Sequence, residues 1–469
     1  MLHRVLFSTR AFVRAYSAVP RNARFAQVTP DLLCKFAGVL SMPKSSILSS
    51  LPGGPWTTVE QNDLATFNED WLGKYNGKST CVIRPKSTAE LSDIMRICYD
   101  TNVAVVPQGG NTGLVGGSVP VHDEVVISLA ALNRVRSFDA AAGTLVCDAG
   151  CVLETLDEHV AEYGYMMPLD LGAKGSCQIG GNVAANAGGL RFLRYGSLHG
   201  NVLGLEVVLP NGEILHNLGT LRKNNTGASV LTTGFDLKQL FIGSEGTIGI
   251  ITGVAIATPP RPSATNVAVF GVPSFDAVQS TFQRAKQHLG EILSAYEFID
   301  GETYGLVQTN PSRGVREVFS DRHPMYVLIE TSGSCKTHDD EKLQGLLEDL
   351  LENAIVSDGV LAQDESQVQT LWALRESAPE SYARQGKVYK YDISMPIERM
   401  YELVEHMRSH YDELGLLNKP DRPGPVKYVG GYGHVGDGNL HINIVAENYD
   451  PSIENATVPH IYEWIRDVR

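Results

Sequence analysis

The chain has 469 residues, of which 43% are apolar and 20% are charged, and its formal net charge is −14 at pH 7. This length predicts about two or three domains of a globular protein. The acidic balance argues against nucleic acid as a partner, because neutralising phosphates needs clustered Lys and Arg. The sequence contains no run of 18 apolar residues, so no membrane-spanning helix is predicted. The seven cysteines lack the spacing of a zinc site or a disulfide framework, so we expect reduced thiols.

The first 30 residues differ from the rest of the chain. They contain five arginines and no acidic residue, which is typical of a mitochondrial transit peptide. We therefore expect a transit peptide at residues 1–30 and a mature protein in the mitochondrial matrix. A helical lead-in is predicted at residues 31–75, before a first folded domain at residues 76–257.

The first domain contains a glycine-rich stretch at residues 107–118. A capping box at Ser87–Glu90 predicts a helix before it, and Val103–Val106 predicts a buried strand that leads into it. Glycine can adopt positive φ and bring backbone N–H groups against an anion, so the stretch favours a phosphate-bearing cofactor. It matches neither a Walker loop nor a dinucleotide fingerprint, and a surface glycine turn is the alternative.

Two further glycine-rich stretches follow, at residues 172–189 and 241–249. Three such surfaces in one domain predict a long ligand that lies against the backbone, as an extended dinucleotide does. The elements predicted between them are strands at Val125–Leu129, Val135–Phe138 and Thr144–Cys147, a helix through Val152–Val160 that stops at Gly164, and a hairpin turn at Pro210–Gly212.

Four motifs of this domain resemble the FAD-binding domain of the p-cresol methylhydroxylase and vanillyl-alcohol oxidase (PCMH/VAO) superfamily. They are RP at 84–85, PQGGNTG at 107–113, GGNVAANAGG at 180–189 and GSEGTIG at 243–249. The resemblance implies an α+β fold with two α+β subdomains and an extended FAD. It places the pyrophosphate at Gly109–Thr112, and the isoalloxazine or ribityl side at Gly180–Asn182 and Ile248.

Some relatives attach the flavin through a histidine where this chain has Asn111, so we expect non-covalent FAD. The residues that the resemblance implies for FAD are Pro107, Gln108, Gly109, Gly110, Asn111, Thr112, Gly113, Gly117, Ser118, Gly180, Gly181, Asn182, Asn186, Gly189, Glu245, Gly246 and Ile248.

Residues 260–365 predict a second domain with its own pattern. Strands are expected at Val267–Phe270, Ala295–Ile299, Met325–Glu330 and Gly359–Ala362, with helices through Phe275–Leu289 and Leu343–Leu350. The order βαββαβ is the split ferredoxin-like arrangement, which we expect to form a substrate or cap domain.

Residues 366–469 carry the chemistry-bearing side chains, in a predicted cap of helices and strands. Arg375 lies in an amphipathic helix and Lys390 in a strand, and each alone is more often a solvated charge. From Leu440 the chain alternates, which places His441 and Asn443 on a polar face, and a glycine loop carrying His434 can fold back beside it. Two imidazoles suggest zinc, while two hydrogen-bonded histidines without metal are the alternative.

The motifs LWALRES, YKYD and GYGHVGDGNLHIN resemble the FAD-linked D-2-hydroxyacid dehydrogenase family, in particular its D-2-hydroxyglutarate dehydrogenases, over residues 60–469. The resemblance implies zinc on His434 and His441 beside the flavin, substrate carboxylates on Arg375 and Lys390, and a hydrogen bond from Asn443. It implies oxidation of D-2-hydroxyglutarate to 2-oxoglutarate by hydride transfer to flavin N5, assisted by zinc at the hydroxyl. Electrons would pass to an electron-transfer flavoprotein or a quinone-linked carrier. A homodimer is left open.

Two features depart from the family pattern. The sequence stops at Arg469, before the Glu-His-Gly motif that in the family supplies a third metal ligand and a base. We therefore expect FAD binding with an incomplete zinc site and little turnover. Pro379 stands where some relatives carry a hydroxyl residue, so D-lactate dehydrogenase is an alternative, as is a truncated product that binds FAD without activity.

Overall fold

The computed structural model describes residues 20–53, 56, 58–71, 73–219, 235–310 and 317–468. These residues form two compact units: an N-terminal unit of residues 20–188 and 195–261, and a C-terminal unit of residues 189–194 and 262–468. Among them, no helix has the length and apolar content needed to cross a membrane. Most of the predicted transit peptide, residues 1–19, lies outside the described residues.

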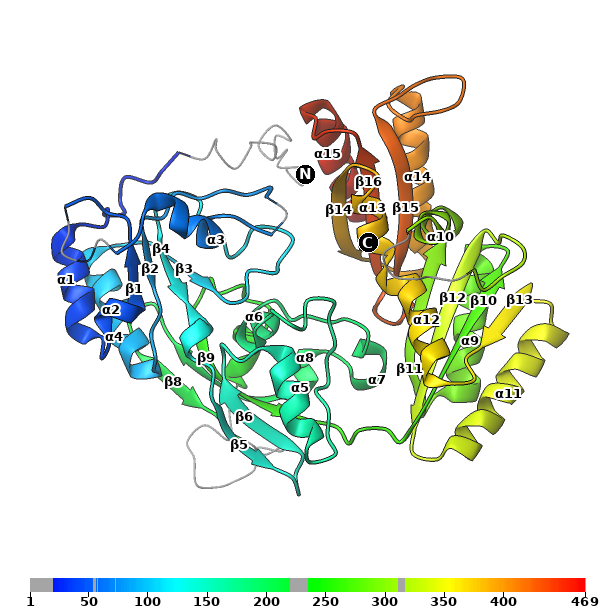
Figure 1. Cartoon of the computed structure of the whole chain (residues 1–469), viewed down its shortest axis with the longest axis horizontal. Helices are drawn as coiled ribbons and strands as arrows, with labels where there is room; N and C mark the ends of the chain where they lie inside the picture. The colour runs from blue at the N-terminus through cyan, green and yellow to red at the C-terminus, as the bar shows by residue number, and fades with distance from the viewer. Residues whose placement is uncertain are drawn as a thin grey trace, which may run out of the picture. The chain divides into compact units, whose positions relative to one another are not determined.

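The first sheet of the N-terminal unit has the strand order β1-β2-β4-β3. Strands β2, β4 and β3 are parallel, and β1 pairs antiparallel with β2. The predicted helix start is confirmed, because Ser87 Oγ accepts a hydrogen bond from Glu90 N. The elements, seen in Figure 1, are α1 (Pro30–Val39), α2 (Pro43–Ser46), β1 (Ile47–Ser49), α3 (Ala65–Asn68), β2 (Cys81–Ile83), α4 (Thr88–Thr101), β3 (Val105–Gln108) and β4 (Val125–Ser128).

The strand before the first glycine-rich stretch differs from its prediction. It spans Val105–Gln108 rather than Val103–Val106, and it is half-buried because it is the edge strand of the sheet. Within residues 107–118, only Asn111 and Gly116 adopt positive φ, at +53° and +71°. Of the glycines in the stretch, only Gly116 therefore adopts the positive φ that was predicted. Gly110 instead permits a close approach to Ser176, and the Cβ positions of Gly113 and Gly117 face open space.

The second sheet of the N-terminal unit is antiparallel, with the order β5-β6-β9-β7-β8. The predicted hairpin turn is confirmed, since Gly212 has φ +84° between β7 and β8. Together the two sheets and their helices form the two α+β halves that the sequence predicts. The elements are β5 (Val135–Asp139), β6 (Thr144–Asp148), α5 (Leu153–Ala161), α6 (Ile179–Ala184), α8 (Leu198–Asn201), β7 (Val202–Val208), β8 (Ile214–Asn217) and β9 (Ile250–Ala257).

Residues 20–29, within the range predicted as transit peptide, are part of the folded N-terminal unit. Arg21 forms an ion pair with Asp123, and Ala26 forms a parallel bridge with Val103. Val28 belongs to the hydrophobic core, and Thr29 caps α1 by accepting from Leu32 N. The ordered structure therefore begins before residue 30.

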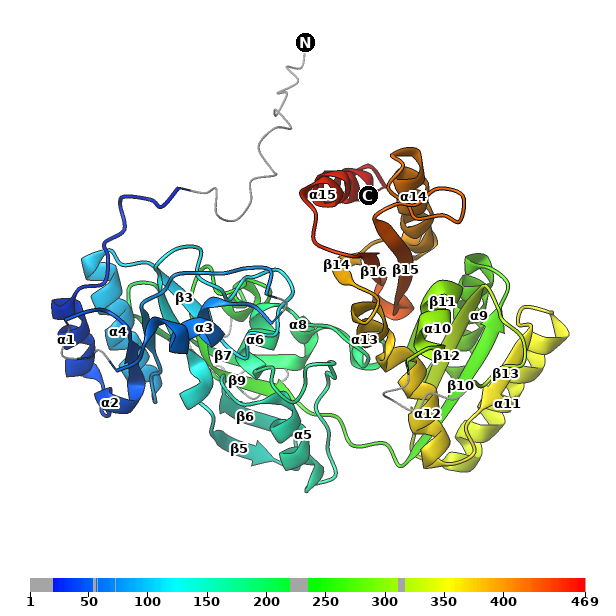
Figure 2. The same cartoon turned by 45° about the horizontal axis from the view of Figure 1, so that its top comes forward.

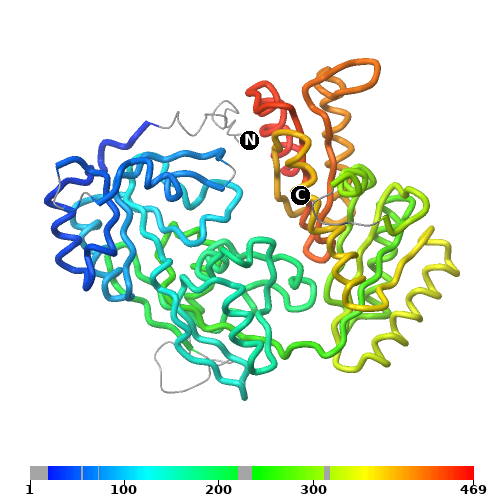
Figure 3. Tube along the Cα trace, viewed as in Figure 1, coloured from blue at the N-terminus to red at the C-terminus, as the bar shows by residue number. Residues whose placement is uncertain are grey.

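The C-terminal unit is built on one seven-stranded antiparallel sheet of order β13-β10-β12-β11-β15-β16-β14. Its first four strands with α9 and α11 confirm the predicted ferredoxin-like arrangement, and β15, β16 and β14 extend the same sheet. Figure 3 follows the chain from the green and yellow strands β10–β13 to the orange and red strands β14–β16. The strands are β10 (Ala264–Val272), β11 (Leu293–Asp300), β12 (Met325–Gly333), β13 (Asp358–Leu361), β14 (Lys387–Ser394), β15 (Val426–His434) and β16 (Asn439–Ala446).

Alternation along the strands creates two faces of this sheet. Phe270 of β10 packs in one hydrophobic cluster with residues of α9, α11 and α14, while its neighbour Val269 packs in another with residues of α10, α12 and α13. Figure 2 shows α9 and α11 side by side. The helices are α9 (Phe275–Leu289), α10 (Gly301–Gln308), α11 (Lys336–Glu352), α12 (Glu365–Glu376), α13 (Ala378–Ala383), α14 (Met400–Glu413) and α15 (Pro451–Val468).

The predicted glycine loop around His434 is wrong. Residues Val426–His434 form strand β15, and only a short turn at Val435–Asp437 joins it to β16. The glycines fit the strand because neighbours approach it closely: a Cβ at Gly430 would lie 1.9 Å from the Tyr382 hydroxyl oxygen. His434 is thus held by strand pairing rather than by a loop.

Three histidines join α14 to α15, on the face of the sheet that α9 and α11 cover. His406 Nε2 lies 2.6 Å from His460 Nε2, and the ring of His410 stacks on His460 with 3.7 Å between centroids. Burial and the neighbouring His410 hold the pKa of His406 below its usual range, against the attraction of Glu413. Burial, His410 and His406 lower the pKa of His460, with Glu463 and Glu413 opposing.

Acidification should therefore weaken the docking of α15. The unfolded chain binds protons on these two histidines at higher pH than the folded chain, so stability falls as pH drops through about 6.5. We expect the thermal unfolding midpoint to decrease between about pH 7.5 and 5.5, and to decrease less in a His406→Gln/His460→Gln variant. An equal pH slope in both proteins would show that the cluster does not titrate with unfolding.

Candidate active site

The three glycine-rich stretches meet in the N-terminal unit. A Cβ at Gly110 would lie 2.0 Å from the carbonyl oxygen of Ser176, and one at Gly246 would lie 2.7 Å from Pro107 Cγ. Glu245 N donates to the carbonyl oxygen of Ala184 at 2.8 Å. The backbones of the three stretches are therefore in direct contact, and they form one continuous surface.

This surface offers both space and hydrogen-bond acceptors. The built Cβ positions of Gly113, Gly117 and Gly181 have no heavy atom within 4 Å. Three buried side-chain oxygens of the second stretch have no hydrogen-bond partner among the described residues: Gln178 Oε1, Asn182 Oδ1 and Asn186 Oδ1. Unpaired buried acceptors are costly, so the surface is suited to a ligand that donates hydrogen bonds.

Asn111 holds the first stretch in shape. Its amide nitrogen donates to the carbonyl oxygen of Glu69 at 2.7 Å, and its side-chain oxygen accepts from Ser118 Oγ at 2.7 Å. Gln108 supports the same turn by donating to the carbonyl oxygens of Phe67 and Ser118. The side chain at position 111 is therefore engaged within the protein, and it contains no nucleophile.

The second group of predicted residues meets in the C-terminal unit, on the sheet face covered by α10, α12 and α13. His434 Nε2 lies 3.2 Å from His441 Nε2, with the two rings nearly perpendicular at 84°. The antiparallel register sets this meeting, since His441 pairs with Tyr432 and His434 pairs with Asn439. The predicted polar face of His441 and Asn443 is confirmed.

A carboxylate stands behind each imidazole. Glu297 Oε1 lies 2.7 Å from His434 Nδ1, and Asp392 Oδ1 lies 3.3 Å from His441 Nδ1 without the direction of a hydrogen bond. Burial lowers the pKa of His441 to about 4, with Arg375 adding to the shift and Asp392 opposing it. His441 is thus neutral at neutral pH, so one of its two ring nitrogens is unprotonated.

Two cations border the imidazole pair. Arg375, at the end of α12, is 7% exposed and donates from Nε to Glu297 Oε2 at 2.8 Å. Its terminal Nη atoms make no hydrogen bond within the described part of the chain, and its Cζ lies 4.5 Å from the centre of the Tyr432 ring. Lys390 of β14 has no ion pair with any described residue, and burial lowers its pKa.

Asn443 pairs across the sheet with Lys390 and is almost fully buried. Its amide nitrogen donates to the carbonyl oxygen of His441, while its oxygen has no partner among the described residues. The buried hydroxyl of Tyr432 has none either. The face between Arg375 and Lys390 therefore holds unpaired polar atoms, as a binding site for a polar ligand does.

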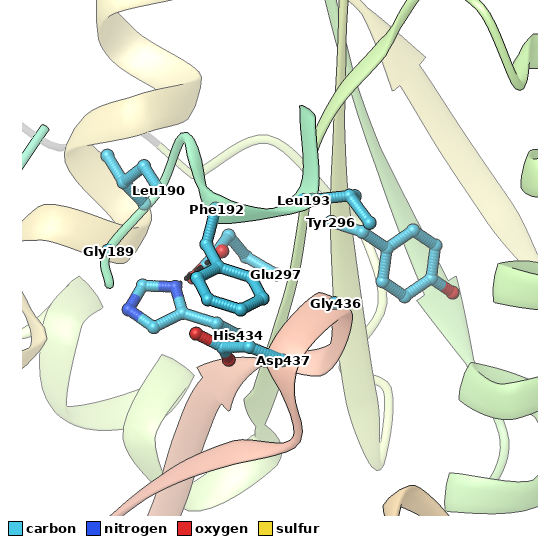
Figure 4. Close-up of a pocket in the computed structure, with 9 residues that line it drawn as sticks. All are labelled: Gly189, Leu190, Phe192, Leu193, Tyr296, Glu297, His434, Gly436 and Asp437. Carbon is cyan, nitrogen blue, oxygen red and sulfur yellow. Dashed lines mark hydrogen bonds and ion pairs between the residues drawn. The ribbon is translucent and has the colours of Figure 1, made fainter. Parts of the chain in front are cut away.

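A small, shallow hollow lies beside His434. Figure 4 shows the imidazole of His434, the carboxylates of Glu297 and Asp437 and the ring of Phe192 gathered together, while the ring of Tyr296 points away. Residues 189–194, which continue the second glycine-rich stretch, thus form part of the C-terminal unit beside the imidazole.

The comparisons with known proteins match both parts of the chain. A family model of the FAD binding domain matches residues 79–217, and a model of the C-terminal domain of FAD linked oxidases matches residues 261–468. The mitochondrial D-2-hydroxyglutarate dehydrogenase of Rattus norvegicus is 50% identical, over 97% of this chain and 82% of its own length. A mitochondrial protein of Schizosaccharomyces pombe named "Putative D-lactate dehydrogenase" is 48% identical, over 96% and 83%.

The chain belongs to the FAD-linked D-2-hydroxyacid dehydrogenase family. Among solved structures, p-cresol methylhydroxylase matches with a TM-score of 0.70 over 93% of this chain and 86% of that chain, at 12% identity. That likeness confirms the predicted PCMH/VAO-type fold.

The glycine surface of this family member fits FAD. Its open glycines leave room for an extended molecule, and its unpaired oxygens on Gln178, Asn182 and Asn186 match the N–H and hydroxyl donors of a flavin and its ribityl chain. Asn111 lacks a nucleophile, which fits the non-covalent binding predicted from the sequence. The residues predicted at Gly109–Thr112, Gly180–Asn182 and Ile248 all belong to the three stretches.

Gly110→Ala should weaken FAD retention. The new Cβ would meet the carbonyl oxygen of Ser176 at 2.0 Å and force the first two stretches apart, at a cost of about 1–3 kcal/mol or more. We expect gel-filtered variant protein to hold at least about tenfold less FAD per chain than the wild type. Gly38→Ala, in α1 with no heavy atom near the new Cβ, is the matched control. Equal flavin content in all three proteins would contradict this reading of the contact.

The imidazole pair suits two bonds to zinc. Zn–N bonds of about 2.0–2.1 Å at a tetrahedral angle separate the nitrogens by about 3.3–3.4 Å, close to the 3.2 Å found between the Nε2 atoms. The carboxylates near each Nδ1 are the partners that zinc-bound histidines commonly have. Within the described ranges, no group of three or more His, Cys, Asp or Glu side chains is arranged to hold a metal.

Four residues of the two sites were not predicted: Gln178, Glu297, Asp392 and Tyr432. Glu297 carried a signal, because it is an acidic residue between the aromatic Tyr296 and Phe298 in the interior of the strand Leu293–Asp300. Asp392 and Tyr432 lie inside the motifs YKYD and GYGH, but only strand register shows that both pair with His441.

Proposed function

We propose that this protein oxidises D-2-hydroxyglutarate to 2-oxoglutarate in the mitochondrial matrix, with non-covalent FAD and a zinc ion on His434 and His441. The observation that carries the proposal is the convergence of an imidazole pair and two cations on one sheet face, where Arg375 keeps its Nη atoms free and Lys390 has no ion pair with a described residue. A five-carbon hydroxy-diacid carries two negative charges and needs two cationic partners. The names of the rat and fission-yeast relatives support a D-2-hydroxyacid substrate and a mitochondrial location.

Each cation has a distinct part in substrate binding. The free Nη atoms of Arg375 suit bidentate binding of the carboxylate next to the hydroxyl, since its Nε is already committed to Glu297. Lys390, whose ammonium has no ion pair with any described residue, takes the distal carboxylate. In the space between Arg375 and Lys390, the unpaired atoms of Asn443 and Tyr432 supply neutral hydrogen bonds to the substrate. This arrangement fixes both ends of the diacid.

The chemistry divides between the bound groups and the chain. Zinc, when bound, supplies a Lewis acid that lowers the pKa of the substrate hydroxyl. FAD, held at the glycine surface, would supply the two-electron oxidant for the substrate Cα–H bond, with release of the hydroxyl proton. An electron-transfer flavoprotein or a quinone-linked carrier would be the final acceptor of the two electrons. The protein orients the Cα–H bond by holding both carboxylates.

D-lactate is the second candidate substrate. Pro379 lies in the first turn of α13, close in sequence to Arg375, and proline has no N–H with which to bind a distal carboxylate. A monoacid needs only one of the two cations. Selectivity for the diacid then depends on Lys390 alone.

Dye-coupled turnover tests the proposal. Full-length protein loaded with FAD is assayed with D-2-hydroxyglutarate, L-2-hydroxyglutarate and D-lactate, with and without added zinc. We expect the highest kcat/KM for D-2-hydroxyglutarate and a dependence on zinc, with slow turnover because the described residues hold no group of three metal ligands. A preference for D-lactate would favour the second candidate. Bound FAD without turnover of any substrate would favour the alternative of a flavin-binding but inactive product.

A further inference from the structure

Glu297 lies between His434, which is proposed to bind zinc, and Arg375, which is proposed to bind a substrate carboxylate. It lies on β11, is 1% exposed, and pairs in register with His434 of β15. Its two carboxylate oxygens bind different partners: Oε1 lies 2.7 Å from His434 Nδ1, and Oε2 accepts from Arg375 Nε at 2.8 Å. One buried side chain therefore contacts both an imidazole of the metal pair and the guanidinium that faces the substrate.

These contacts determine the state of both partners. A carboxylate only accepts hydrogen bonds, so it places the proton of His434 on Nδ1 and leaves the lone pair on Nε2, toward His441. For Arg375, the bond at Nε and the Tyr432 ring beneath Cζ fix the plane of the guanidinium and leave both Nη atoms for a ligand.

We propose that Glu297 is a positioning residue that prepares both halves of the site at once, His434 for zinc and Arg375 for a substrate carboxylate. The inference rests on the proposed function. A carboxylate that merely stabilised the fold would not select a tautomer of His434. Its loss from a protein that still folds would leave the affinities for zinc and for substrate unchanged.

Asp392 provides the one-sided comparison. It pairs in register with His441 and lies 3.3 Å from His441 Nδ1, but it forms no hydrogen bond or ion pair with Arg375, whose carboxylate partner is Glu297. Its side chain is 41% exposed, so its replacement is far less of a threat to folding than replacement of Glu297. Asp392 should therefore influence the metal side alone.

Glutamine at position 297 cannot serve both partners. An amide has one oxygen and one NH2 group, while Arg375 Nε–H and His434 Nδ1–H are both donors in the wild type. The oxygen goes to the charged Arg375, so the NH2 group faces His434. The imidazole must then accept at Nδ1 and carry its proton on Nε2, where zinc would bind.

The experiment uses FAD-bound full-length protein and two independent binding measurements. Zinc affinity is measured by competition with a chromophoric chelator. The affinity for 2-oxoglutarate is measured in metal-free protein from the change in the flavin spectrum. The variants are Glu297→Gln, Glu297→Asp, Asp392→Asn and Arg375→Lys.

We expect Glu297→Gln to bind zinc about 10- to 100-fold more weakly, the usual effect of removing a partner of a metal-bound histidine, and 2-oxoglutarate at least severalfold more weakly. Asp392→Asn should weaken zinc only, and Arg375→Lys should weaken 2-oxoglutarate only. Glu297→Asp should restore part of the zinc affinity. Unchanged zinc affinity in folded Glu297→Gln would overturn the proposal.

Nitrogen NMR of the histidines in the metal-free wild type gives a readout that needs no variant. The proposal predicts a protonated Nδ1 and a bare Nε2 on His434, and a protonated Nε2 would overturn it even if Glu297→Gln failed to fold. If the wild type binds no zinc while His434 has the predicted tautomer, the zinc site of the proposed function is wrong. The positioning of His434 by Glu297 is then still supported.

Discussion

Replacing Lys390 with methionine should lower kcat/KM for D-2-hydroxyglutarate by about 10- to 150-fold. A hydrogen bond to a charged group contributes about 1.5–3 kcal/mol, and about 1.4 kcal/mol is a factor of ten. The same change should alter kcat/KM for D-lactate by less than about threefold, because lactate has no distal carboxylate. The ratio of the two effects identifies the carboxylate that Lys390 binds.

The Lys390→Met protein should remain folded. Lys390 has no ion pair with a described residue, and burial already lowers its pKa, so removing the charge leaves no partner unpaired. Lys387→Met is the matched control, since Lys387 lies on the same strand with an exposed side chain. Equal losses for the diacid and for lactate would end the assignment of Lys390 to the distal carboxylate.

Arg375→Lys should lower kcat/KM for both substrates, on the order of 100-fold, although the positive charge is kept. Lysine cannot bind Glu297 through one nitrogen and a carboxylate through two others, as the guanidinium does. It also loses the planar contact with the Tyr432 ring. Both substrates share the carboxylate next to the hydroxyl, so both should be affected.

Arg384→Lys is the control for that change, because Arg384 is an exposed residue that pairs with Glu380 on α13. Steady-state kinetics of the two variants with each substrate make the comparison. If Arg375→Lys reduced turnover of the diacid but spared lactate, the carboxylates assigned to Arg375 and Lys390 would have to be exchanged.

Local patterns in the sequence were sufficient to predict much of the fold. The capping of α4 by Ser87 and the alternation from Leu440 depend on neighbouring residues alone, and both are found as expected. The edge position of β3 depends on how distant strands order themselves, which explains why Val103–Val106 was placed too early and judged buried.

For the site in the C-terminal unit, the sequence predicted the two histidines proposed to bind zinc and the residues proposed to bind substrate, but not the residues that position them. His434 and His441 stand in one motif, but the strand character of Val426–His434 was hidden by glycines that close packing requires. Glu297 is 137 residues from His434 in sequence, and they meet only because β11 pairs with β15. A contact of that range follows from sheet order, which a local pattern does not contain.

The most direct test of the account mixes full-length protein, loaded with FAD and zinc, with D-2-hydroxyglutarate in the absence of oxygen and of any electron acceptor. We expect the visible absorbance of oxidised flavin to disappear and one 2-oxoglutarate to form per flavin. Oxidised flavin that persists while the site is saturated with D-2-hydroxyglutarate would contradict it.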